Sequence, residues 1–368
     1  MEDRVRRAHR RRWAACALRP SAWRMERHDG WCRLSCRAEG WTLQVETRDG
    51  ELAPSLEALA GLLLLPCLCS RRRLVVPGSP DPAWRENMGR LAAILHGWWG
   101  WEERPRWRFR RGAGAPAAHP GERGTGAFFS GGVDSFHTLL FSPRPIRALI
   151  GVAGFDVRLR DTERLAWLES TLREVARQRG IEAIWIRTNV REIPLIEGAG
   201  WERVHGAALA AVGHLLRHRL ERVLIPSTVP FKRRRAWGST WEIDPLWSSG
   251  SLVFAPDGCE FDRNEKVARL AGNPLVERYL RVCWANEPGA VNCSRCEKCL
   301  RTMLQWAVCG HPLPRTFDPG VSLEHRLGQV REVPPNSLPL YRDLLPKLEG
   351  RSGLRTAVER LIARSPSS

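Results

Sequence analysis

The hydrophobic and polar positions of this chain follow two different rhythms on either side of residue 120. Residues 41–110 mix short alternating runs with helical stretches at 56–69 and 82–101, which is typical of a small α+β unit. After a segment rich in Gly, Ala and Pro at 111–126, apolar runs alternate with periodic helical stretches. Strands separated by such helices predict βαβ crossovers, a parallel sheet, and ligands at the carboxyl ends of its strands.

Four apolar runs after residue 120 are the predicted strands, and the stretches between them are the predicted helices. The strands are expected at 126–129, 146–154, 182–190 and 221–228, and the helices at 134–141, 162–179 and 201–219. Beyond Pro226 the chain is expected to be loop-like to residue 258, with later helices at 298–308 and 353–364. We therefore predict an α/β fold with a small α+β domain over 1–120, a parallel-sheet domain over 121–325 and a helical tail over 326–368.

The chain of 368 residues has a formal charge of +18 and a pI near 10.5. Such a surplus suggests an anionic partner, for example nucleic acid. Only four of the 58 basic residues are lysines, however, and a GC-rich genome would encode this arginine bias without selection for a polyanion. A solvated arginine-rich surface is an equal alternative. The densest basic runs lie at 4–12, 71–73 and 233–235.

Hydrophobic residues make up 43% of the chain, enough for a real core, but no run predicts a membrane span. The most apolar stretch, 56–69, is interrupted by Pro66 and is shorter than the roughly 20 residues needed to cross a bilayer. The N-terminus lacks the apolar segment of a signal peptide. We therefore expect a cytoplasmic protein with no membrane partner, and a homodimer is compatible with the sequence. Eleven cysteines, several at metal-ligand spacing, favour reduced thiols.

The segment SGGVDS, residues 130–135, lies between a predicted strand and a predicted helix. Gly131 and Gly132 allow positive φ and close approach of a ligand, and the free amides at the helix start favour an anion. Ser130 and Ser135 add hydroxyl donors. Asp134 would repel a phosphate unless a cation intervenes, so a Mg²⁺ shared by the carboxylate and the phosphates is expected. The alternative is a plain strand-to-helix turn in which Ser or Asp caps the helix.

Four cysteines, Cys283, Cys293, Cys296 and Cys299, follow one another as C-x9-C-x2-C-x2-C. Two-residue spacings let successive thiolates turn onto one tetrahedral ion, and four ligands leave no open coordination position. A structural Zn²⁺ is therefore predicted, whose binding free energy would be part of the folding free energy of this segment. An iron–sulfur cluster and unligated thiols are the alternatives.

SGGVDS resembles the pyrophosphate loop of the PP-loop N-type ATP pyrophosphatases, and it lacks the Gly-Lys-Ser/Thr ending of a Walker-type loop. Together with the four cysteines, it makes residues 124–310 similar to the 7-cyano-7-deazaguanine synthase family of queuosine biosynthesis. The resemblance implies a Rossmann-like PP-loop domain, of the adenine nucleotide alpha hydrolase-like type, with a zinc knuckle. It also implies Asp134 and Ser135 as catalytic residues and ATP bound by Ser130, Gly131, Gly132, Val133, Asp134 and Ser135.

Two segments, 151–159 and 230–250, depart from that family where its members carry their substrate-pocket sequences. Asp156 follows the second of the predicted strands and could hold a metal or a substrate amine, although a loop-capping role is an equal alternative. Lys232 could neutralise phosphate charge, against the alternative of a solvated basic loop. Asp244 is the best polar candidate in an aromatic, Pro-interrupted stretch that suits a lid or a pocket wall.

The leading functional prediction is an ATP pyrophosphatase-type ligase. It would adenylate a carboxylate or amide oxygen, release pyrophosphate, and let a nitrogen nucleophile displace AMP. A second prediction is a thiolation-type enzyme acting on tRNA or nucleotides, which the basic charge favours and for which Cys67 and Cys69 are the one close cysteine pair outside the zinc site. A third is a non-catalytic ATP- and zinc-binding interaction module.

Overall fold

The structure, a computed structural model, describes residues 17–110, 122–335 and 337–365. The basic run at 4–12 and most of the predicted linker, residues 111–121, lie outside the described residues. Contacts divide the chain into two compact units that are discontinuous in sequence. Unit 1 comprises the described residues of Met1–Phe128 and Pro143–Cys259, and unit 2 those of Phe129–Ser142 and Glu260–Ser368.

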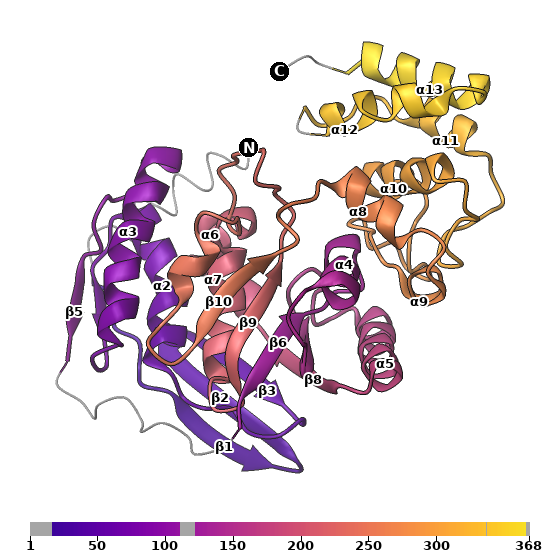
Figure 1. Cartoon of the computed structure of the whole chain (residues 1–368). Coiled ribbons are helices and arrows are strands. Elements are labelled where there is room, and N and C mark those ends of the chain that lie inside the picture. Colours follow the sequence, from indigo (N-terminus) through magenta and orange to yellow (C-terminus); the bar gives the residue numbers. More distant parts are fainter. Residues whose placement is uncertain (1–16, 111–121, 336, 366–368) are drawn as a thin grey trace. The chain divides into compact units, whose positions relative to one another are not determined.

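Unit 1 contains an eight-stranded sheet in the order β1-β2-β3-β8-β7-β6-β9-β10 (Figure 1). Its strands are β1 (Arg24–His28), β2 (Trp31–Ala38), β3 (Trp41–Thr47), β6 (Gly124–Phe128), β7 (Ala148–Ala153), β8 (Glu182–Thr188), β9 (Leu220–Pro226) and β10 (Val253–Asp257). The five strands from β8 to β10 are parallel, whereas β1, β2 and β3 are antiparallel to one another and β3 is antiparallel to β8. The predicted α/β class with a mostly parallel sheet is confirmed.

Strands from both sides of residue 120 share this sheet, because β3 pairs with β8 from Val45 and Thr188 onward. The division of the chain into domains 1–120, 121–325 and 326–368 remains a prediction. The prediction of loop structure up to residue 258 was wrong for β10. This strand pairs with β9 alone, so it is an edge strand, and an edge tolerates Pro256, which has no N–H to donate.

The helices of unit 1 cover both faces of the sheet. They are α2 (Leu56–Ser70), α3 (Pro82–Trp99), α5 (Thr162–Arg179), α6 (Pro194–Ala199) and α7 (Trp201–Leu215), with the short 3₁₀ helices η1 (Val190–Glu192) and η2 (Asp244–Trp247). On one face, α5 lies close to Gly151 of β7, where an added Cβ would come within 2.9 Å of Leu172. On the other face, α2 and α7 contribute to the main hydrophobic core with side chains of β2, β3, β8 and β9.

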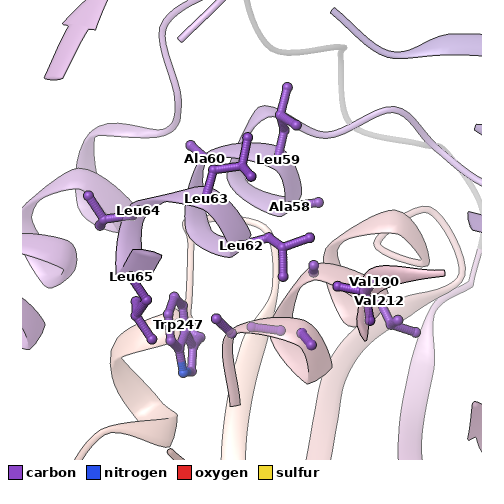
Figure 2. Close-up of a cluster of buried hydrophobic side chains, with 14 of the residues drawn as sticks. Ala58, Leu59, Ala60, Leu62, Leu63, Leu64, Leu65, Val190, Val212 and Trp247 are labelled. Atoms are coloured by element: carbon purple, nitrogen blue, oxygen red, sulfur yellow. The ribbon is translucent and has the colours of Figure 1, made fainter. Parts of the chain in front are cut away.

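Helix α2 is buried on nearly every side, as the run of apolar residues predicts. Figure 2 shows Leu65 of this helix beside the indole ring of Trp247 of η2. A Cβ at Gly61 would lie 3.3 Å from both Trp247 and Trp84, so the glycine lets two indole rings approach the helix backbone. No helix in the described part of the chain is long and apolar enough to cross a membrane.

Unit 1 also contains a small parallel sheet formed by β4 (Leu74–Val76) and β5 (Trp107–Phe109). Leu18 extends it through a parallel bridge to Leu74. The alternating sequence of β5 turns Trp107 and Phe109 towards the core and leaves the arginines between and after them exposed.

Unit 2 is helical. It contains α4 (Val133–Phe141), α8 (Arg263–Leu270), α9 (Pro274–Tyr279), α10 (Glu297–Val308), α11 (Leu323–Gln329), α12 (Leu338–Arg342), α13 (Ser352–Ala363) and the 3₁₀ helix η3 (Leu345–Leu348). The predicted helices at 134–141, 298–308 and 353–364 are confirmed within one residue. Helix α8 was not predicted, and it begins with a capping box in which the side chains of Asp262 and Glu265 each accept the other's backbone N–H.

Candidate functional site

The SGGVDS turn joins Phe128, the last residue of β6, to the start of α4 at Val133. Gly131 has a φ of +72°, a left-handed conformation that explains the glycine. Gly132 is the N-cap residue and has no side chain to cap α4, so the first amides of this nine-residue helix receive no side-chain acceptor from it. Ser135 Oγ donates to Gly132 O at 3.0 Å and tightens the turn. A helix start with this geometry favours an anion, and the anion site expected here remains a prediction.

Asp134, in the first turn of α4, faces two cations from α8. Lys266 Nζ donates to Asp134 Oδ1 at 3.0 Å, and Arg263 Nη1 lies 3.9 Å from Oδ2. The side chain of Lys266 is 2% exposed and that of Asp134 is 19% exposed. Burial raises the pKa of Asp134, but Lys266, Arg263 and Lys298 together outweigh it and hold the pKa below its ordinary value. The carboxylate is therefore ionised at neutral pH and is matched by buried positive charge.

Arg263 connects this ion pair to a buried polar network on α10. Its Nη2 donates to Thr302 Oγ1 at 3.0 Å. Burial, and then the charge of Arg301, lowers the pKa of Arg263 to about 10, so the guanidinium is still a cation at neutral pH. Arg301 in turn pairs with Glu297 at 3.0 Å, and the hydroxyl of Tyr341 on α12 donates to Glu297. The buried polar network next to Asp134 thus extends through α10 to Tyr341 of α12.

His137 lies one turn after Asp134 on α4 and is buried. Its Nε2 lies 3.3 Å from Arg269 Nη1, and Phe141 and Phe261 flank the imidazole ring. Burial, reinforced by the charges of Lys266 and Arg269, lowers the pKa of His137 to about 4. The neutral imidazole can therefore accept a hydrogen bond from the Arg269 guanidinium.

The four cysteines expected to bind metal form one cluster. The sulfur atoms of Cys283, Cys293, Cys296 and Cys299 all lie within 4.8 Å of one another, and those of Cys293 and Cys299 are 3.9 Å apart. A tetrahedral Zn²⁺ with Zn–S bonds of about 2.3 Å places its sulfurs about 3.8 Å apart. The cluster could hold a metal ion such as zinc, and its compactness fits one ion better than an iron–sulfur cluster, whose thiolates bind different irons. Cys296 N donates to Cys293 Sγ at 3.2 Å, a contact within the cluster.

One short segment, residues 279–283, connects the cysteine cluster to the glycine turn. Arg281 N donates to Gly131 O at 2.8 Å, and Cys283 is itself a member of the cluster. Asn292 supports the segment from the other side: its Oδ1 accepts the amides of Val282 and Cys283 at 2.8 and 3.1 Å, and its Nδ2 donates to Leu280 O. The cysteine cluster and the glycine turn therefore share one stretch of backbone.

The three candidate substrate residues lie in unit 1. Asp156 is exposed in the loop after β7, where its charge acts on Arg191 and His205. Lys232 is exposed in the loop after β9. Asp244 begins η2 and is 0% exposed, and its Oδ2 accepts the hydroxyl of Ser239 at 2.9 Å. Burial raises the pKa of Asp244 to about 8, which makes it a neutral carboxylic acid at pH 7. Their substrate roles remain predictions.

Sequence reasoning missed Lys266 and Arg263, the cations beside Asp134. One available signal was the capping box of α8, because D-x-x-E before a periodic stretch marks a helix start. A second was the scarcity of lysine, since two of the four lysines, Lys266 and Lys298, act on the pKa of Asp134.

We also compared the chain with known proteins. No family model matches it, and neither a curated protein nor a solved structure shows significant similarity.

Proposed function

We propose that unit 2 binds the phosphates of ATP at the start of α4 and that the protein is an ATP pyrophosphatase-type ligase. The observation that carries the proposal is the pairing of an uncapped, glycine-rich helix start with the buried cations Lys266 and Arg263. Both cations lie beside the carboxylate of Asp134, in the first turn of a helix whose N-cap residue, Gly132, has no side chain to occupy the first amides. Such a site favours a multiply charged anion over a neutral ligand.

In the proposed reaction, a carboxylate or amide oxygen of the substrate attacks the α-phosphorus of ATP. The bond from that phosphorus to the bridging oxygen breaks, and pyrophosphate leaves with the negative charge. The amides of the turn and the hydroxyls of Ser130 and Ser135 would bind the departing phosphates. Lys266 and Arg263 would stabilise the charge that develops on them. A nitrogen nucleophile then displaces AMP from the activated oxygen-bearing carbon.

Two metal ions belong to this proposal with different roles. Mg²⁺ would arrive with the nucleotide and offset phosphate charge, and the carboxylate of Asp134 is the acidic group of the turn that could contact it. The cysteine cluster would hold a structural Zn²⁺, since all four ligands come from the chain. Its role would be to fold the 279–283 segment that contacts Gly131.

The test is ATP-dependent release of pyrophosphate across a panel of carboxylic acids and amides with ammonia as nucleophile, together with calorimetric titration of Mg²⁺·ATP. We expect Asp134→Asn to abolish pyrophosphate release. Asp29→Asn is the matched control, because the Asp29 side chain is 96% exposed. Release of orthophosphate instead of pyrophosphate would refute the ligase. ATP binding without any turnover, unchanged by Asp134→Asn, would favour the non-catalytic module.

The thiolation alternative has less support from the cysteines outside the cluster. Cys67 is buried in α2, and burial raises the pKa of its thiol to about 12. A thiol in this state is neither nucleophilic nor accessible at neutral pH. The pair Cys67 and Cys69 is therefore a weak candidate for sulfur transfer.

A further inference from the structure

Unit 1 contains a cavity of about 350 Å³ beside the small β4–β5 sheet. Three arginines from three separate segments border it. Its lining residues are Arg19, Pro20, Ser21, Arg37, Val75 and Arg110. We refer to it as the arginine pocket.

The fold explains why these arginines meet. Leu18 bridges in parallel to Leu74, and β5 runs parallel to β4, so Arg19 and Arg110 each follow directly after a segment of one parallel sheet. The carboxyl ends of parallel strands are where ligands generally bind in α/β proteins. Arg37 comes from β2 and is held in place by Ser21, whose Oγ accepts Arg37 N at 3.0 Å and whose N donates to Arg37 O at 2.8 Å.

The pocket has positive charge without a counter-ion from the described chain. Neither Arg19, Arg37 nor Arg110 forms an ion pair with an acidic side chain of the described residues. Other arginines of the same unit do, for example Arg33 with Glu46 and Arg173 with Asp49. Residues 111–121, which continue the chain from Arg110, contain no Asp or Glu. The three guanidinium groups are exposed, so a ligand from solution can reach them.

We propose that the arginine pocket binds a small ligand with two or more phosphate groups. Planar guanidinium groups bind phosphate oxygens two at a time. A cavity of this volume is within the range of small-ligand sites and is large enough for an oligophosphate or a mononucleotide. The lining residues belong to unit 1 and those of the helix start to unit 2, so this proposal does not rest on the proposed ligase activity.

The probe is inorganic tripolyphosphate, titrated calorimetrically into the whole protein. We expect the triple variant Arg19→Gln/Arg37→Gln/Arg110→Gln to lose one class of binding sites, and each single variant to weaken that class about tenfold. The matched control is Arg104→Gln/Arg160→Gln/Arg179→Gln, three exposed arginines of unit 1 with the same change in net charge. The control should bind as the wild type does.

Hydrogen exchange then locates the site and separates it from the proposed ATP site. Tripolyphosphate should protect amides in residues 18–37 and 74–110 in the wild type and equally in Lys266→Met, whose ATP-site cation is removed. The proposal would be overturned if the arginine-pocket variants bound tripolyphosphate as tightly as the wild type does. It would also be overturned if the control triple variant weakened binding as much as the pocket triple variant does. Protection of these residues by single-stranded RNA but not by tripolyphosphate would also overturn it and would assign the surface to nucleic acid. A cooperative thermal unfolding transition like that of the wild type would show that the variants fold.

Discussion

Replacing Lys266 by methionine removes the buried ammonium that bonds Asp134 while keeping a side chain of similar length. We expect this change to destabilise unit 2 and to weaken binding of Mg²⁺·ATP. The remaining cation, Arg263, lies 3.9 Å from the other carboxylate oxygen and cannot replace the 3.0 Å contact that Lys266 makes. Asp134 would keep its negative charge, now incompletely compensated.

The size of the effect follows from the geometry. At 3.0 Å and an effective dielectric constant of about 20, the attraction between the two charges is about 5.5 kcal/mol before desolvation is subtracted. Removing one member of a buried pair costs about 3–5 kcal/mol, because the other charge is left buried. Asp134 is 19% exposed and keeps the second cation, and both facts reduce this cost. We therefore expect Lys266→Met to lower the free energy of unfolding by about 3 kcal/mol. The coupling energy in a double-mutant cycle with Asp134→Asn should be about 2 kcal/mol.

The assay is urea unfolding of wild type, Lys266→Met, Asp134→Asn and the double variant at pH 7, followed by exchange of unit 2 amides. Lys347→Met is the control, because Lys347 is an exposed lysine of the same unit. The sign of the pH dependence gives a second check. Since the folded pKa of Asp134 is lowered, its contribution is present above its unfolded pKa and is lost as the pH falls below about 4. Additive single-variant effects, with no coupling, would refute the buried ion pair.

Three further changes test other parts of the structure. In the folded chain the pKa of His137 is about 4, against an ordinary 6.5, so stability should fall by about 3 kcal/mol as the pH drops from 6.5 to 4. His137→Phe should remove that part of the slope in urea unfolding, and an unchanged slope would contradict the assignment. Asp244→Asn should stabilise unit 1 by on the order of 4 kcal/mol at pH 7. In the folded chain the pKa of Asp244 is raised to about 8, whereas in the unfolded chain the carboxyl ionises from about pH 4 upward. Above that pH, the ionised carboxylate therefore favours the unfolded state. Equal melting temperatures of Asp244→Asn and wild type at pH 7 would argue against this. Elemental analysis should find one bound metal ion per chain, and Cys299→Ser or chelation should increase amide exchange in residues 279–310, whereas Cys309→Ser, outside the cluster, should not.

The parallel half of the sheet was predictable because its strands are continuous apolar runs between periodic helices. Residues 146–154 and 182–190 illustrate this, since a strand buried on both faces needs no alternation. The antiparallel half was harder to place. The pattern of 41–47 predicts a strand, but nothing within it indicates that Val45 pairs with Thr188, more than 140 residues away. Which strands pair with each other depends on how all the elements of the core pack together. The same holds for the position of β10 at the edge of the sheet.

The candidate site was predictable where the chemistry is local in sequence. Both the SGGVDS turn and the cysteine cluster depend on spacings within about 20 residues, and the structure brings all four cysteines together. Lys266 and Arg263 could not be assigned, because a charged residue on a short amphipathic helix usually faces solvent. Only the packing of α8 against α4 shows that these two charges are buried against Asp134.

This packing changes the role that the sequence suggested for Asp134. From sequence, a carboxylate beside an anion-binding helix start called for a bridging metal ion. In the structure, the carboxylate already bonds one buried cation and attracts another, and without it Lys266 and Arg263 would repel each other across the same space. Asp134 therefore holds two positive charges near the first turn of α4, and in the proposed ATP site this would lower the reorganisation needed to bind a phosphate. It is best understood as a positioning residue for those cations, and the loss expected from Asp134→Asn follows from their disorder as much as from a lost metal ligand.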